Sequence, residues 1–255
     1  MIRSPRMSPK TPPPPLEDSV SAFSRRCREA GFDIVHPFSV AAHNSTASRA
    51  QQLGTFGRPR PLGLIVGNTR YFWRVFREAL DADANLRNAV NPVDDYTEAK
   101  IGFATAALGR STLVSYVHVV DPGPLPIQRI AHAAGLAFLS PSHLSIHPTY
   151  GPWLAFRAAI VLDEDELPVA GGLDDGPCVR CTKPCLPALE LAVASTRDPT
   201  VTSLGDSWPL WAKVRDACPV GRGHRYGEDQ IRYHYAKDRT MLGVTLGSSG
   251  SGRSR

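Results

Sequence analysis

Long apolar runs are missing from this sequence of 255 residues. No stretch approaches the roughly 18–20 apolar residues that a membrane-spanning helix needs, so we expect no membrane partner. The first fifteen residues carry positive charge but lack the apolar segment of a secretory signal, which favours a cytoplasmic location. Three motifs are absent as well: G-x-G-x-x-G, G-K-[ST] and G-x-S-x-G. Dinucleotide sites, ATP-type phosphate loops and serine-hydrolase sites are therefore unsupported.

Ordered blocks of basic residues are also missing. The net charge is +5, and five basic residues lie near the chain ends, at Arg3, Arg6, Lys10, Arg253 and Arg255. Without them the body of the chain is near neutral, so the basic pI of about 9.1 gives little support to nucleic-acid binding. We therefore expect no nucleic-acid partner.

The composition is that of a globular protein, with 42% hydrophobic and 21% charged residues. Proline is frequent, at 23 residues, but four of these form the run Pro12–Pro15. We expect a disordered tail over residues 1–15, one domain over 16–243 and a flexible tail over 244–255.

Hydrophobic periodicity predicts an α+β domain with a helical, cysteine-bearing C-terminal part. Residues 41–60 are polar and rich in Gly, Ser and Ala, which predicts a long loop. The predicted strands are 32–38, 62–66, 112–120 and 153–162, and the predicted helices are 16–31, 69–80, 91–109, 126–139, 186–195, 206–217 and 227–236.

Four of the five cysteines fall in one short stretch, at Cys178, Cys181, Cys185 and Cys218. Their pattern, C-x2-C-x3-C followed by Cys-Pro, favours metal binding by a segment spanning residues 172–220. A single 4Fe–4S cluster fits best, because Cys-Pro commonly follows the last ligand of such clusters. Structural zinc, ordinary reduced thiols and disulfides remain open. Cys27 lies on the apolar stripe of the first helix and reads as an inert core thiol.

Three polar side chains stand out in the apolar middle of the chain: His132, His147 and Arg157. Arg157 lies inside the strand WLAFRAAIVL, where a buried arginine needs an anionic partner. That partner is either a carboxylate such as Asp163 or the carboxylate or phosphate of a ligand, which suits a planar guanidinium. The two histidines read equally well as satisfied core residues.

Several segments resemble the CblC family of cyanocobalamin decyanases and alkylcobalamin dealkylases. They occur in the family's order and cover most of residues 16–243, and the IHP…G-W…R block is the most specific of them. The segments are AGFDIVHPFSVAAHN (30–44), NPVDDYTEAKIG (91–102), IAHAAGLAF (130–138), LSIHPTYGPWLAFRAAIVL (144–162), VRDACP (214–219) and RYGEDQIRYHYAKDRTMLG (225–243).

The resemblance implies a nitroreductase-like fold, with a central antiparallel sheet flanked by helices, that holds cobalamin with its lower base detached. It implies an oxidoreductase that removes the upper axial ligand, using reduced flavin or glutathione. His132, His147 and Gly151 would then lie at the cobalamin. Arg157 would act in catalysis and, with Arg215 and Arg239, bind glutathione.

The cysteine pattern departs from that family, because GPCVRCTKPCLPAL resembles the cluster-binding segment of epoxyqueuosine reductases. A built-in cluster would relay electrons in place of glutathione or flavin. Three other functions remain open: a reductase that uses cobalamin on another substrate such as a modified nucleoside, a carrier that passes cobalamin to an acceptor protein, and a zinc-stabilised binding domain.

Overall fold

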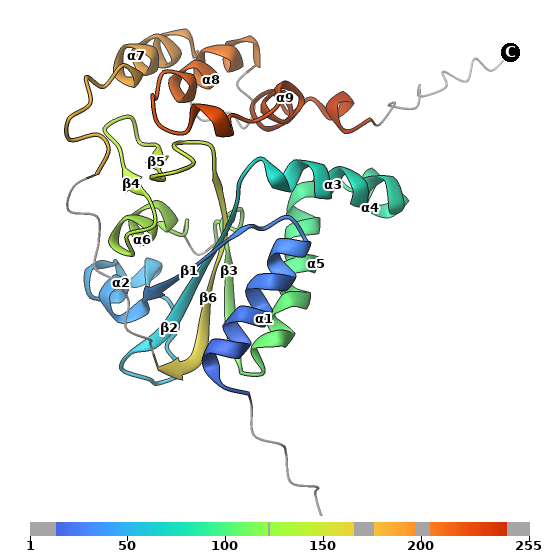
Figure 1. The fold of residues 1–255 in the computed structure, drawn as a ribbon, viewed down its shortest axis with the longest axis vertical. Helices are drawn as coiled ribbons and strands as arrows, with labels where there is room; N and C mark the ends of the chain where they lie inside the picture. The colour runs from blue at the N-terminus through green and yellow to red at the C-terminus, as the bar shows by residue number, and fades with distance from the viewer. Residues whose placement is uncertain (1–13, 122, 166–175, 197–204, 244–255) are drawn as a thin grey trace, which may run out of the picture.

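Four antiparallel strands in the order β1-β2-β6-β3 form the central sheet (Figure 1). The strands are β1 Ile34–Ser39, β2 Pro61–Asn68, β3 Thr112–Tyr116 and β6 Ala155–Asp165. The computed structural model describes residues 14–121, 123–165, 176–196 and 205–243. Strand β2 is buried along its whole length, because helices cover both faces of the sheet.

One face of the sheet packs against α1 Leu16–Glu29, α3 Tyr71–Ala82 and α5 Pro92–Thr105. Alternate residues of β2 (Leu62, Leu64 and Val66) point to this face, as the two-residue period of a strand requires. Helix α5 begins with Pro92 in its first turn, and the chain turns at Gly109 with a φ of 64°. The short α4 Ala84–Asn88 joins α3 to α5.

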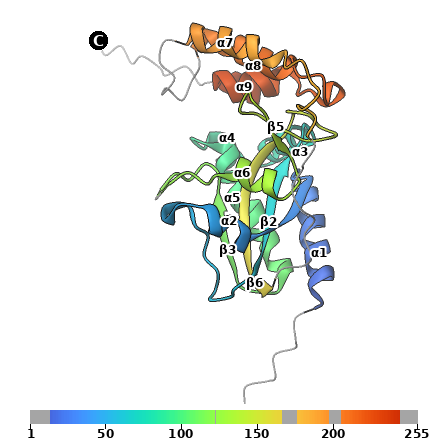
Figure 2. The same ribbon diagram turned by 90° about the vertical axis from the view of Figure 1, so that its left-hand side faces the viewer.

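The opposite face packs against α2 Val40–Thr46 and α6 Ile127–Ala133 (Figure 2). A small hairpin of β4 Phe138–Leu139 and β5 Ser145–Ile146 follows α6.

The C-terminal helices gather beyond one end of the sheet, next to the β4–β5 hairpin (Figure 1). They are α7 Cys185–Ser195, α8 Trp208–Asp216 and α9 Glu228–Ala236. Trp153, just before β6, packs with Ala212 of α8 and Ile231 of α9, which fixes these helices to the start of that strand.

The predicted α+β class, with a central antiparallel sheet and a helical cysteine-bearing C-terminal part, is confirmed. Two details of the prediction are wrong. Residues 41–60 are not all loop, because they include α2 and a 3-10 turn, Arg49–Gln51. The helix predicted over 126–139 ends early, because the chain enters the left-handed region at Gly135, with a φ of 74°.

The predicted tails lie almost wholly outside the described residues, and the domain boundaries stay predictions. Among the described helices, none is long and apolar enough to cross a membrane.

Candidate functional site

A cavity of about 550 Å³ lies between the segment before α6, the β4–β5 hairpin and the start of β6. Its wall includes Leu125, Leu139, Leu154 and Phe156, and Arg215 of α8 also lines it. The cavity therefore offers a mainly aliphatic and aromatic surface with two arginines, Arg129 and Arg215, in its wall.

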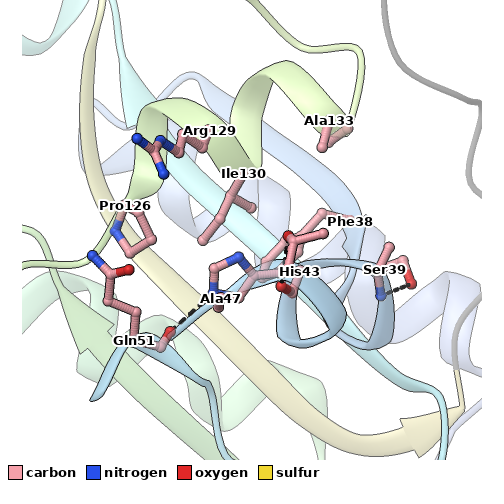
Figure 3. Close-up of a pocket in the computed structure, with 12 residues that line it drawn as sticks. Phe38, Ser39, His43, Ala47, Gln51, Pro126, Arg129, Ile130 and Ala133 are labelled. Atoms are coloured by element: carbon pink, nitrogen blue, oxygen red, sulfur yellow. Dashed lines mark hydrogen bonds between the residues drawn. The ribbon is translucent and has the colours of Figure 1, made fainter. Parts of the chain in front are cut away.

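A second cavity of about 270 Å³ lies between α2 and α6 (Figure 3). Figure 3 shows Ile130 and Ala133 of α6 on one side and His43 and Ala47 on the other. The two cavities share Pro126 and Arg129. They therefore adjoin at the beginning of α6.

Arg129 is the charged group on this shared border. Its side chain is exposed, and no ion pair or side-chain hydrogen bond engages it within the described part of the chain. A guanidinium at the mouth of an apolar cavity suits a ligand that combines an aromatic or aliphatic body with a phosphate or carboxylate.

His132 lies on α6 but does not line either cavity. Its Nδ1 accepts a hydrogen bond of 3.4 Å from the Leu139 N–H, and its ring meets the Phe138 ring edge-on at 5.2 Å. These contacts connect α6 to β4, so the structure gives His132 a local packing role beside its predicted role at cobalamin.

His147 and Gly151 form a turn before β6. The Nδ1 atom of His147 accepts the N–H groups of Thr149 and Tyr150, at 3.0 and 3.3 Å. Burial lowers the pKa of His147, and the nearby His36 and His224 lower it further. A neutral imidazole is therefore favoured, which keeps Nδ1 free to accept both bonds.

Gly151 allows the turn to approach the C-terminal segment closely. Its φ is 58°, and a Cβ atom there would lie 2.0 Å from the Val220 carbonyl oxygen. Only glycine fits this contact without displacement of one backbone.

Arg157 lies near the start of β6 with Asn68 as its hydrogen-bond partner. Its Nε donates to the Asn68 Oδ1 atom at 2.6 Å, and its guanidinium carbon lies 5.0 Å from the centre of the Phe72 ring. Its Nη2 is buried without a partner, and burial lowers the pKa of the guanidinium. No carboxylate among the described residues forms an ion pair with it.

The alternative prediction, an ion pair between Arg157 and Asp163, is therefore wrong. Asp163 accepts from Arg58 Nε at 2.6 Å. Six residues along one extended strand place Asp163 roughly 20 Å from Arg157, too far for an ion pair.

The other two predicted arginines occupy different places. Arg215 lines the larger cavity, donates from Nε to the Tyr235 hydroxyl at 2.7 Å, and also donates to the Pro152 carbonyl. Arg239 donates to the carbonyls of Val90 and Arg87, at 2.8 and 3.1 Å, just past and within the end of α4. Arg239 thus stabilises a helix end and does not line either cavity.

The four clustered cysteines are all free thiols, so the disulfide alternative is wrong. Burial raises the pKa of Cys178, and Cys218, Cys181 and Cys185 raise it further. In the described part of the chain, however, no three His, Cys, Asp or Glu side chains are arranged to hold a metal ion.

Cys178 also lines a third cavity of about 490 Å³, together with Leu139 and His143. Both of those residues line the largest cavity as well. Cys178 therefore lies beside the largest cavity. The fifth cysteine, Cys27, is fully buried in the core, as predicted, and burial raises its pKa to about 12.

Sequence reasoning missed a polar group on α9 and the turn before it: Tyr226, Gln230 and His234. Each has a buried side-chain atom without a hydrogen-bond partner. For Gln230 and His234 the spacing of four residues was the available signal, because residues four apart share one face of a helix.

An antiparallel sheet covered on both faces, with the larger cavity beside Arg215 of α8 and the smaller one between α2 and α6, is the architecture of an α+β protein. No protein-family model matches this chain. It is 26% identical over 236 residues to the Homo sapiens protein named cyanocobalamin reductase / alkylcobalamin dealkylase, a match that covers 86% of this chain and 75% of that protein. A Bos taurus protein of the same name matches at 26% identity over 238 residues.

Among solved structures, the B12-trafficking protein CblC of C. elegans matches with a TM-score of 0.66 at 18% identity, covering 89% of this chain and 94% of that one. The predicted fold class and the resemblance to the CblC family are confirmed. Epoxyqueuosine reductase from Bacillus subtilis matches with a TM-score of 0.46 at 12% identity, covering 83% of this chain and 68% of that one, and this weaker likeness carries no argument.

Proposed function

We propose that this chain is an oxidoreductase that binds cobalamin and removes its upper axial ligand, acting in the cytoplasm. The observation that carries this function is the pair of adjoining cavities, of about 550 and 270 Å³. The larger apolar cavity suits the corrin ring, and the smaller one suits the detached lower base. The names of the mammalian relatives support the same activity.

Arg129 would bind the phosphate that links the corrin to the lower base, because it lies on the border that the two cavities share. Ala133 and Ala134 line the smaller cavity, where their short side chains leave room for an aromatic ring. The cobalt supplies the reactivity on reduction, while the protein supplies binding, orientation and a water-poor surface.

Arg157 would bind an anionic co-substrate rather than the corrin. Its Nη2 is buried without a partner, and no described carboxylate neutralises its charge. The carboxylate of a small thiol such as glutathione, or a flavin phosphate, would meet that need.

A 4Fe–4S cluster on Cys178, Cys181, Cys185 and Cys218 would supply electrons next to the cobalamin. Two observations support it: the thiols influence one another, and Cys178 lines a cavity that shares residues with the largest one. Their present arrangement is not a ligand geometry. Binding would have to draw the thiols together, as metal binding commonly does in cysteine-rich segments.

Anaerobic iron and sulfide analysis tests the cluster. We expect about four iron and four sulfide atoms per chain, lowered by Cys218→Ser and unchanged by Cys27→Ser. Stoichiometric zinc without sulfide, after anaerobic reconstitution, would contradict the cluster and leave a structural metal site.

Turnover of cyanocobalamin tests the activity itself. With glutathione or reduced flavin under anaerobic conditions, the absorption spectrum of bound cyanocobalamin should change to that of a reduced cobalamin, with release of cyanide. Tight binding without spectral change, with either reductant and with a chemical reductant of the cluster, would identify a cobalamin carrier instead.

A further inference from the structure

The cysteine group, which consists of Cys178, Cys181, Cys185 and Cys218, reaches the surface on one side. Cys185 and Cys218 are only 8% and 7% exposed, whereas Cys178 and Cys181 are half-buried. The group therefore has two inner thiols and two outer ones. A redox centre held by these thiols would meet a reductant from solution at Cys178 and Cys181.

Two segments carry the thiols, and they meet where α7 begins. The Cys181 N–H donates to the Cys178 carbonyl at 3.4 Å, and the Lys183 N–H donates to the Cys181 Sγ atom at 3.3 Å. These bonds form a compact turn that leads into α7. Cys185, the first residue of α7, shares a buried apolar cluster with the last turn of α8, and Cys218 follows that turn.

The same two segments carry three exposed cations: Arg180, Lys183 and Arg222. Residues 176–196 and 217–224 contain a single carboxylate, that of Glu190. The carboxylate of Asp216, at the end of α8, already forms an ion pair with Arg225 at 2.7 Å. None of the three cations forms an ion pair with a described residue. The surface around the outer thiols is therefore net positive.

An apolar side chain lies among these charges. Val179, between Cys178 and Arg180 in the sequence, is 60% exposed. Val179, Cys178 and Lys183 line the same open cavity, so the apolar side chain, an outer thiol and a cation share one place on the surface. Interfaces between electron-transfer proteins are small and short-lived, and opposite charges steer the encounter. This surface has that character.

We propose that the outer side of the cysteine group is a docking surface for a small acidic protein that carries single electrons. The surface consists of Val179, Arg180, Lys183 and Arg222. The proposal rests on the proposed function in one respect, namely that the thiols hold a redox centre. In each encounter the carrier gives up one electron, which enters at the outer thiols. Two encounters supply the two electrons that reduce cobalt from the +3 to the +1 state, with cyanide leaving as the anion.

A protein fits this surface better than a nucleic acid does. Residues 176–196 contain no aromatic side chain on which a base could stack. Three cations also neutralise few phosphates, whereas nucleic-acid affinity grows with the number of phosphates that are neutralised. An acidic protein partner needs only a few steering charges beside an apolar contact.

Binding of an acidic plant-type ferredoxin, with its 2Fe–2S centre oxidised, tests the surface without turnover or cobalamin. Calorimetric titration of the anaerobically purified full chain should give a dissociation constant in the roughly micromolar range at about 0.02 M salt. The affinity should fall at least about tenfold at about 0.5 M salt, because salt screens exposed charges.

A double variant and a matched control sharpen the test. Arg180→Glu with Lys183→Glu should lower the ferredoxin affinity at least about tenfold, because two attractive charges become repulsive. Both side chains are exposed, so iron content and melting temperature should stay unchanged. Arg25→Glu is the control, because it makes the same charge change at an exposed position of α1, a helix well away from α7 in Figure 1. If the double variant does not fold, Arg222→Glu takes its place.

Stopped-flow reduction separates docking from the redox centre itself. Reduced ferredoxin, at concentrations below its dissociation constant, should reduce the double variant at least about tenfold more slowly than the wild type. Reduced methyl viologen is a small cation that needs no docking surface. It should reduce the double variant at least as fast as the wild type.

Equal ferredoxin affinity of the wild type and the double variant would overturn the proposal, as would an equal loss in Arg25→Glu. Binding of an RNA hairpin in place of ferredoxin, abolished by the double variant, would overturn it as well. Ferredoxin binding by a protein without iron would support the surface and contradict the cluster. An iron-loaded protein that does not bind ferredoxin would overturn the docking surface and leave the proposed function intact.

Discussion

Arg157 combines three features that rarely coincide in one side chain: an enclosed Nη2, a neutral hydrogen-bond partner in Asn68 and an aromatic neighbour in Phe72. Asn68 is itself fixed, because its amide donates to the Thr69 carbonyl at 2.9 Å and so presents its oxygen to Arg157. The guanidinium is therefore oriented before any ligand arrives, which lowers the entropic cost of binding.

Arg157→Ala should impair reductant use more than cobalamin binding. The loss of one charged, two-pronged contact corresponds to roughly 1.5–3 kcal/mol, or about ten- to hundredfold in affinity for the anionic co-substrate. Comparison of the KM for glutathione with the Kd for cobalamin measures the difference. Equal losses in both constants, or unfolding with full activity per folded molecule, would make Arg157 a structural residue.

Cys27 gives a prediction for stability against pH. Burial raises its pKa from 9.0 to about 12, so the unfolded thiol loses its proton before the folded one does. The stability that follows from its burial is complete below pH 9 and falls as the pH rises from 9 towards 12, by about 1.4 kcal/mol per unit. Denaturant unfolding at pH 8 and pH 10 should show a steeper loss for the wild type than for Cys27→Ser, and parallel losses would contradict the assignment.

At the scale of elements, the turn before β6 and the segment after α8 meet backbone to backbone. Gly151 and Gly221 face each other across this contact, and a Cβ atom on Gly221 would lie 2.2 Å from the Tyr150 carbonyl carbon. The same segment carries Cys218, so this contact helps to place the cysteine group beside the largest cavity.

Gly151→Ala should therefore destabilise the protein in two ways. Alanine is strained in the left-handed region, and its Cβ atom would overpack against the facing backbone, which should cost roughly 1–3 kcal/mol more. Gly57→Ala is the matched control, because Gly57 also has a positive φ, of 77°, but nothing lies within 4 Å of its added Cβ. Chemical denaturation of both variants gives the comparison. A similar loss of stability in both would show that the close contact contributes nothing.

The strong apolar periods were predictable from sequence, and the less regular elements were not. Strand β2 and helix α3 follow clear patterns of apolar residues, and both were predicted. Helix α2 was missed because its residues, VAAHNST, are small or polar and carry no 3.6-residue apolar period. Its formation depends instead on tertiary contact, since Val40 is fully buried against β2 and α6.

The site was predictable in residue type more than in arrangement. An arginine in a buried strand predicted either an ion pair or a ligand, but its partners, Asn68 and Phe72, come from β2 and α3 and could not be read from local sequence. The helix-end role of Arg239 was hidden for the same reason, because its acceptors lie about 150 residues earlier. Long-range placement requires the fold.

At the scale of the whole molecule, the largest cavity lies where α6, the β4–β5 hairpin, the start of β6 and α8 meet. This region brings together Arg129 of α6, Arg215 of α8 and Cys178 from the turn before α7.

Arg129→Ala should weaken cobalamin binding about ten- to hundredfold, without loss of thermal stability, because Arg129 is exposed and unpaired among the described residues. Spectrophotometric titration measures that loss, and unchanged affinity would remove Arg129 from the site.

Titration of cobalamin with the wild-type protein tests the central claim most directly. The two adjoining cavities predict that the lower base leaves the cobalt on binding, so the visible absorption should shift to the base-off form with a dissociation constant in the micromolar range or below. A spectrum that stays base-on, or unchanged, with excess protein at micromolar concentrations would contradict the account.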